Sequence, residues 1–307
     1  MNANPIPVKK HGKLSQEGRG YQVFTVVNTL ALILIAIITL YPMYYVVIAS
    51  ISDAGEMGRQ TGLLLYPVGK WNLFSYQLVF RNSLVLSGFG NTLFIVVVGL
   101  AINMAMTCLG AYVLAQKGAM LVKPLSMLIL FTMYFSGGIV PTYLNIRELG
   151  LMDTLWSLII PVAIDTYNLL IMRSAFASVP DTLTEAARLD GASHFKILTR
   201  VFIPLSGATL AVMVLYYAVG HWNSWFRASL YIADPNKYPL QLVLRNILLL
   251  NQTSDMNASV TDLGELAKYA ESVKYALIVV SSLPILILYP FLQKFFAKGV
   301  MVGALKG

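Results

Sequence analysis

Charge is the scarcest property of this sequence. Only 12% of the 307 residues are Asp, Glu, Lys or Arg, whereas 57% are hydrophobic. An average soluble domain is about 25% charged, so this composition does not suit a water-exposed surface. The single cysteine, Cys108, excludes an internal disulfide and a multi-cysteine metal centre. We expect Cys108 to pack as a small apolar residue.

Motifs for catalysis are also missing. The chain has no GxxxxGK[ST] loop that could cradle a nucleotide phosphate, no HExxH and no GxSxG. Its three histidines, His11, His194 and His221, fall in three separate regions. We therefore predict that this chain is not an enzyme, that it has no ATPase site of its own, and that it binds no metal or cofactor. No basic patch interleaved with aromatic residues points to nucleic acid.

Long apolar runs dominate what is present. A helix needs about 20 apolar residues to cross a bilayer. Strands of a membrane barrel would instead show strict alternation over about 10 residues, a pattern that this chain lacks. The fold class predicted is therefore an all-α transmembrane bundle with six spans: Val23–Ile48, Phe89–Ala115, Leu125–Leu144, Leu155–Met172, Leu205–Phe226 and Tyr275–Gln293.

The distribution of Lys and Arg predicts the orientation. With six spans both termini share one side, and that side holds 13 of the 22 basic residues. The positive-inside rule places this side in the cytoplasm. We therefore predict a multi-pass protein of the bacterial plasma membrane with both termini cytoplasmic, and we attribute the net charge of +8 to topology and lipid headgroups.

Four regions follow along the chain. We expect a cytoplasmic tail over 1–22, a first helix with an extracytoplasmic loop over 23–88, a core domain over 89–296, and a cytoplasmic tail over 297–307. The outer segments 52–88 and 227–274 are either plain connections or a docking surface for an extracytoplasmic partner. Residues 261–276 are predicted to form a helix, and Arg147, Glu148 and Asp153 in a short outer loop are expected to be solvated.

The largest cytoplasmic loop, 174–204, has its own helix signals. Thr182 and Glu185 have the spacing of a capping box, which predicts a helix start at Thr182. Gly191 is expected to end this helix because glycine tolerates positive φ. Ser193 can then cap a second short helix. The product is a helix–turn–helix bracket at the membrane surface.

The same loop carries a motif. Glu185-Ala186-Ala187, three residues, Gly191, nine residues and then Val201-Phe202-Ile203-Pro204 resembles the EAA motif of binding-protein-dependent ABC importers. This resemblance implies that Glu185, Ala186, Ala187 and Gly191 belong to the coupling helix that docks on an ATP-binding subunit. The alternative is an ordinary capped surface helix with a glycine stop.

Further stretches, among them SGGIVPTYLNIRELGLMDTLWSLIIP, WNSWF and FFAKGVMVGALKG, resemble permeases of the maltose-transporter class. They are most similar to the branch that imports oligosaccharides derived from polysaccharides. The resemblance implies a type I permease fold, a second homologous permease, two ATP-binding subunits that bind ATP-Mg, and an extracytoplasmic sugar-binding protein or lipoprotein. It covers about residues 23–307 and leaves 1–20 without a role.

Three residues are candidates for the substrate pathway. Trp222 and Asn223 lie at the predicted outer end of the fifth span, where a ring face and an amide could contact a sugar. The competing interpretation is an aromatic belt at the membrane interface or a structural contact. Asp165 is the one acidic residue inside a predicted span, which marks a functional site by default. A helix cap after the break at Pro161 is the favoured role for Asp165.

Two other functions remain open on sequence alone. The first is an importer of the same mechanism for a peptide or phosphate. The second is a stand-alone secondary transporter, a class that usually shows inverted repeats and coupling acids. No repeat is visible here, and the importer permease is the favoured hypothesis.

Overall fold

The computed structural model describes residues 18–57, 62–116, 121–254, 272–288 and 290. Over these residues every regular element is a helix and none is a strand. The predicted fold class, an all-α membrane bundle, is therefore confirmed. Within the described residues the predicted spans fall largely in helical segments, and two helices there are by themselves long and apolar enough to cross a membrane.

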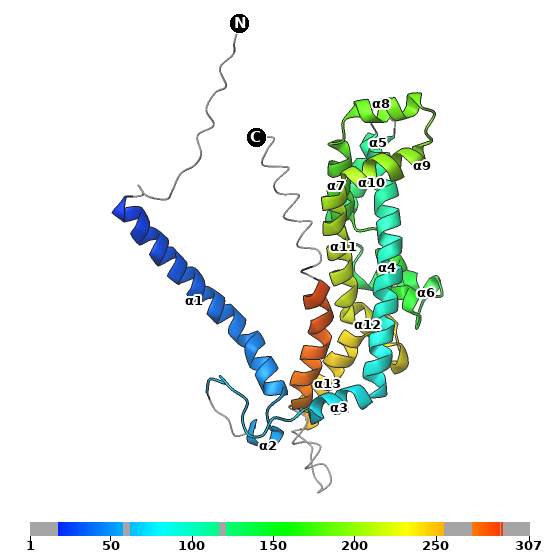
Figure 1. Ribbon diagram of the computed structural model, residues 1–307. Helices are drawn as coiled ribbons and strands as arrows, with labels where there is room; N and C mark the ends of the chain where they lie inside the picture. Colours follow the sequence, from blue (N-terminus) through cyan, green and yellow to red (C-terminus); the bar gives the residue numbers. More distant parts are fainter. Residues whose placement is uncertain (1–17, 58–61, 117–120, 255–271, 289, 291–307) are drawn as a thin grey trace.

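The two long helices are α1, Arg19–Ser50, and α4, Ser83–Ala115. They cover the first and second predicted spans. Between them lie the short helices α2, Ala54–Met57, and α3, Phe74–Arg81. Figure 1 shows α1 slanting down, apart from the bundle at its upper end, to α2 and α3, and α4 running back up within the bundle beside α7 and α11.

The third and fourth spans are corrected by the structure, because neither is one straight helix. The third consists of α5, Val122–Tyr134, and α6, Ile139–Glu148, which meet at 114°. The corner lies at Gly138, whose φ is +91°. The fourth consists of two 3₁₀ turns, η1 and η2 (Leu155–Leu158 and Ile160–Val162), and α7 (Thr166–Ala177), bent by 46°. Pro161 lies in the second turn, where a proline ring and a missing N–H prevent a continuous helix.

The fifth span is shorter than predicted. It is α11, Gly207–Trp222, and a turn separates it from α12, Trp225–Tyr231. Before α11 the chain forms α8, Asp181–Leu189; α9, His194–Ile197; a π-helical turn η3, Leu198–Phe202; and α10, Ile203–Leu205. The segment His194–Leu205 meets α11 at 88°.

The carboxyl-terminal part adds η4, Pro235–Lys237, then α13, Leu240–Ser254, and an apolar helix Ser272–Leu288. This last helix covers most of the sixth predicted span. The predicted helix over 261–276 lies outside the described residues up to 271, and so do residues 1–17 of the predicted amino-terminal tail and the whole carboxyl-terminal tail. Helix α1 begins at Arg19, inside the predicted tail 1–22.

Side chains from α4, α7 and α11 form the main core. Tyr112 and Phe176 both pack edge-to-face on Phe202, with ring centroids 5.1 Å and 5.3 Å away. Cys108 is buried in the same cluster, as predicted for a packing residue. A second cluster joins α4 and α13 to the helix Ser272–Leu288 around Trp222. The core thus surrounds α4 on several sides.

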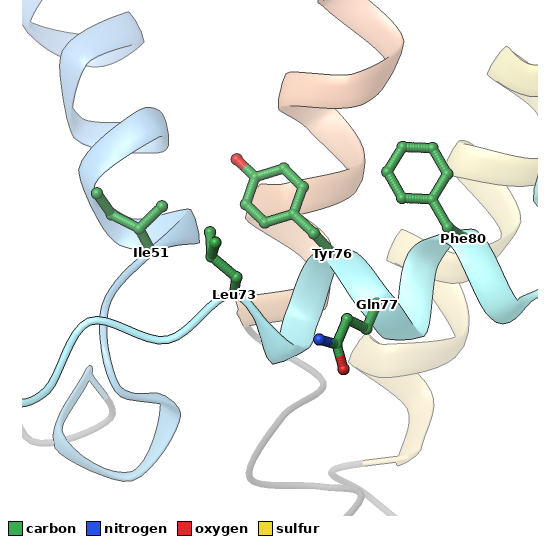
Figure 2. Close-up of a pocket in the computed structure, with 5 residues that line it drawn as sticks. All are labelled: Ile51, Leu73, Tyr76, Gln77 and Phe80. Carbon is green, nitrogen blue, oxygen red and sulfur yellow. The ribbon is translucent and has the colours of Figure 1, made fainter.

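The contacts of helix α1 with other described residues lie toward its carboxyl end. There the hydroxyls of Ser50 and Tyr76 are 2.7 Å apart, and Tyr45 packs edge-to-face on Tyr275. Beside this joint lies a groove lined by Ile51, Leu73, Tyr76, Gln77 and Phe80. Figure 2 shows Tyr76 and Phe80 rising from α3 on the side of the neighbouring helices, with Gln77 pointing the opposite way.

Candidate functional site

The bracket formed by α8 and α9 lies at one end of the bundle, away from α2 and α3 (Figure 1). Gly191 has a φ of +73°, so it ends α8 as predicted. Its amide donates to the Arg188 carbonyl, and the next amide, of Ala192, donates to the Ala187 carbonyl. These two bonds make a Schellman motif, which satisfies carbonyls at the helix end and reverses the chain. Ser193 then caps α9 by accepting a hydrogen bond from the Lys196 amide, also as predicted.

The predicted capping box is wrong. Helix α8 begins at Asp181, with Pro180 at the N-cap and no side-chain cap hydrogen bond. The fixed φ of proline suits a helix start, so the helix begins one residue before Thr182. Glu185 consequently lies within the helix, is exposed, and forms no hydrogen bond or ion pair with the described part of the chain. Its carboxylate is free for an external contact.

The two alanines of the motif have different environments. Ala186 is exposed, whereas Ala187 is half-buried and packs on the cluster around Phe176 and Phe202. Ala187 therefore holds α8 against its own bundle, and Ala186 remains at the surface. Three large apolar side chains lie exposed in the same bracket: Leu183 at 43%, Leu189 at 89% and Phe195 at 69%. We call Glu185, Ala186 and these three side chains the bracket surface.

Polar contacts hold the bracket in place. The Tyr112 hydroxyl lies 2.9 Å from His194 Nδ1, which links the end of α4 to α9. Arg188 donates to the side-chain oxygen of Gln116 over 3.2 Å. Arg173 on α7 donates to the Leu114 carbonyl over 3.1 Å. The first two contacts thus attach the bracket to the end of α4, and the third attaches α4 to α7.

Deeper in the bundle, a polar column joins α4 to α11 and to the break before α7. The side-chain oxygen of Asn103 accepts a hydrogen bond from His221 Nε2 at 2.6 Å, and its side-chain NH₂ donates to the Val162 carbonyl at 2.5 Å. One turn away, Thr107 and Tyr217 share a hydroxyl contact of 2.7 Å. The Tyr217 hydroxyl also accepts from the Asp165 amide. The column thus satisfies backbone groups that the broken fourth span leaves without a helical partner, as a membrane interior requires.

The sequence carried a signal for this column that our predictions missed. Gly99, Asn103, Thr107 and Ala111 recur every four residues on α4 and all are buried. Small and polar residues at this spacing mark a helix-packing face in a membrane. Helices α4 and α11 lie so close together at Gly99 that an added Cβ would be 2.5 Å from His221 Nε2.

Trp222 does not face outward. Its side chain is 4% exposed, its indole N–H donates to the Ser281 carbonyl at 3.0 Å, and Phe89 packs edge-to-face on it. The ring therefore fills the space between α4 and the helix Ser272–Leu288. A role for Trp222 in the substrate pathway stays a prediction.

Asn223 and Asp165 are both exposed. Asn223 ends α11, and its side-chain amide donates back to the Val219 carbonyl at 3.0 Å. Asp165 is the N-cap of α7 and accepts from the Asn168 amide at 2.9 Å. The cap role expected for Asp165 is confirmed, and a pathway role for either residue stays a prediction.

The expectation that Asp153 is merely solvated is wrong. Its carboxylate accepts from the amides of Ala233 and Asp234 and pairs with Lys237 Nζ at 2.8 Å. These contacts lower the pKa of Asp153 to about 2, the side-chain hydrogen bond from Lys237 being the largest cause. Asp153 therefore ties the loop after α6 to the loop after α12.

Comparison with known proteins identifies the family. Residues 92–302 match the family described as binding-protein-dependent transport system inner membrane component. The chain belongs to this family. It is thus a membrane-embedded permease of an ABC importer, which works with a binding protein and ATPase subunits and is not itself a catalytic enzyme.

Individual relatives agree with this family. The permease is 41% identical to Protein LplC of Bacillus subtilis over 93% of the chain and 96% of that relative. It is 35% identical to the polygalacturonan/rhamnogalacturonan transport system permease protein YtcP of the same species, over 90% of the chain and 96% of the relative. A crystal structure of a bacterial ABC transporter involved in the import of the acidic polysaccharide alginate matches with a TM-score of 0.83 and 32% identity, covering 92% of this chain and 99% of that one.

Proposed function

We propose that this permease forms half of the translocation path for an oligosaccharide and that the bracket surface couples it to an ATP-binding subunit. A second, homologous permease would complete the path, two ATP-binding subunits would supply the energy, and an extracytoplasmic binding protein or lipoprotein would deliver the cargo. The relatives named for polygalacturonan and alginate transport support a polysaccharide-derived cargo. The match to curated permeases over more than nine-tenths of the chain supports the mechanism.

The bracket surface carries the coupling proposal. It combines exposed apolar side chains with the Glu185 carboxylate, which has no partner among the described residues, on a helix that is held by its own bundle through Ala187. Apolar side chains left in water favour a protein partner that covers them. Ala186 has no large side chain, so a partner can approach the helix backbone there.

This coupling proposal also fixes the orientation. The bracket would face the cytoplasm, in agreement with the positive-inside rule, and so would the amino-terminal end of α1 and both tails. The opposite end, with α2, α3 and α12, would then face the binding protein. ATP would bind only to the partner subunits, because the chain lacks a phosphate-binding loop of its own.

The experiment is a size series at Ala186 in the assembled importer. Ala186→Trp should abolish uptake and cargo-stimulated ATP hydrolysis, because the indole holds the partner away from α8. Ala186→Ser is the matched control, since serine keeps the small volume and should retain most activity. The permease variants must still insert in the membrane, which a fluorescence or blot assay checks. Full activity of the tryptophan variant would overturn the coupling proposal.

A second variant tests the turn itself. Gly191→Pro cannot adopt a φ of +73° and should abolish transport by misplacing α8 relative to α9. Gly150 also has a positive φ, +67°, and lies just after α6, outside the bracket. Gly150→Pro strains the backbone in the same way, so retained ATPase stimulation in that variant would locate the coupling effect at the bracket.

A further inference from the structure

A cavity of about 210 Å³ lies between the corner that joins α5 to α6 and helix α12. It is lined by Ser136, Gly138, Ile139, Thr142, Phe226, Arg227, Leu230 and Tyr231. Arg227 is the one charged side chain in this lining. Helices α6 and α12, which contribute to the lining, lie away from the bracket helices α8 and α9 (Figure 1).

Arg227 has no partner in the described part of the chain. Its Nε is buried and makes no hydrogen bond, and no carboxylate pairs with the guanidinium. The titratable side chains that act on it are His221 and Tyr231, and neither of them is a carboxylate. A partly buried guanidinium with unused donors is unfavourable unless an acceptor arrives.

The remaining lining defines the kind of acceptor. The Ser136 hydroxyl accepts from the Gly138 amide, so its own hydrogen is available to donate. Ile139, Phe226 and Leu230 provide apolar wall next to these donors. A planar guanidinium matches a carboxylate in shape and charge, and a sugar ring offers both an apolar face and hydroxyls.

We infer that this cavity binds the carboxylate of an acidic sugar unit in the cargo, with Arg227 as the ion partner. The inference rests on the proposed function as an oligosaccharide permease and adds the substrate's charge and the residue that recognises it. One guanidinium and no second cation in the lining fit a single negative charge better than a phosphate dianion.

The test uses the complete importer with its own partner subunits. The probes are trigalacturonate and the neutral trisaccharide made by reducing its carboxyl groups. Arg227→Gln should lower the initial uptake rate of the acidic probe by roughly tenfold or more, the value of one lost charged hydrogen bond. Uptake of the neutral probe should stay unchanged, and Arg227→Lys should retain part of the acidic uptake. Arg147→Gln is the matched control, because it removes an exposed charge from α6 outside the cavity.

A second pair of variants reaches the same cavity from α6. Thr142→Asp places a carboxylate opposite Arg227 and should compete with the acidic probe, whereas Thr142→Asn adds a side chain of equal size without the charge and should not. Loss of acidic uptake in the first variant alone supports the inference even if Arg227 variants fold poorly.

Each other outcome has a separate meaning. Acidic uptake that survives Arg227→Gln overturns the inference, and so does an equal loss for both probes. A complex that falls apart on purification would assign Arg227 to a contact with a partner subunit instead. If the unchanged importer takes up only the neutral probe, this inference fails while the proposed function stands. If it takes up neither, the oligosaccharide function itself fails.

Discussion

Helices α1 and α4 are nearly equal in length, with 32 and 33 residues, and both are apolar enough to cross a membrane. Their environments differ completely. The most apolar 18-residue window of α1 has no buried residue, whereas α4 buries 28% of its window and packs on α7, α11 and α13. Hydropathy therefore predicts that a helix inserts in the membrane, but not how much of it packs against other helices.

The difference lies in small and polar residues. Helix α4 places Gly99, Asn103 and Thr107 on one face, and each of them is buried against a partner helix. Along most of its length α1 exposes Val, Leu and Ile instead, which suit lipid or another apolar surface. In a membrane, close packing and hydrogen bonds select helix contacts, because lipid tails are as apolar as leucine.

The largest expected loss of stability is at Gly99, where helix α4 lies very close to helix α11. Gly99→Val on α4 places carbon atoms against the His221 ring and should destabilise the permease by about 3 kcal/mol. Gly90→Val on the same helix is the control, because nothing lies within 4 Å of a Cβ at that position. The unfolding midpoint of the purified importer measures both. Equal midpoints would mean that α4 and α11 are not in tight contact at Gly99.

The next effect concerns the polar column. Asn103→Leu should cost about 2 kcal/mol, because the Val162 carbonyl and the His221 ring both lose a buried partner. The matched change on α1 is Asn28→Leu, at an exposed position, for which no loss is expected. Thermal unfolding again gives the comparison. A similar loss in both variants would show that α1 is packed in the assembly as closely as α4.

A smaller effect is expected at Tyr217. Tyr217→Phe removes the hydroxyl that bonds Thr107 and the Asp165 amide, and should cost about 1 kcal/mol. The neighbouring Tyr216 is 47% exposed and has no such contact, so Tyr216→Phe should leave the unfolding midpoint unchanged. Faster hydrogen exchange at the start of α7 in the first variant alone would locate the effect at the break. No change there would contradict the role of the column.

The smallest effect is expected outside the membrane, at Asp153. A depressed pKa means that its carboxylate contributes stability above its ordinary pKa near 3.8, and that this contribution is lost as the pH falls toward about 2. The contribution of Asp153 to stability should therefore be constant from pH 5 to 8. Asp153→Asn should remove the loss of stability that the protonation of Asp153 causes at low pH. Glu148→Gln, at an exposed position, should keep that loss. An acid transition that is the same in the Asp153 variant would contradict this assignment.

Several features of the bracket could be predicted from the sequence because they depend on neighbours in the chain. The glycine stop at Gly191 and the cap at Ser193 are local backbone effects, and both were confirmed. The start at Thr182 was wrong because Pro180 offered an earlier helix start that the capping-box spacing concealed. Asp165 as a cap was likewise a local feature and was confirmed.

The sequence by itself determined the class of the protein, since apolar runs, sparse charge and the spacing from Glu185 to Pro204 are properties of the linear chain. Tertiary structure alone decided which faces meet. It turned Trp222 inward, because the indole N–H found an acceptor in Ser281 on a helix 59 residues away. It also brought Asn103 to the broken fourth span and left Arg227 beside a cavity without a partner among the described residues. Those outcomes depend on contacts between segments that are distant in the sequence, and the energies of such contacts cannot be read from the spacing of neighbouring residues.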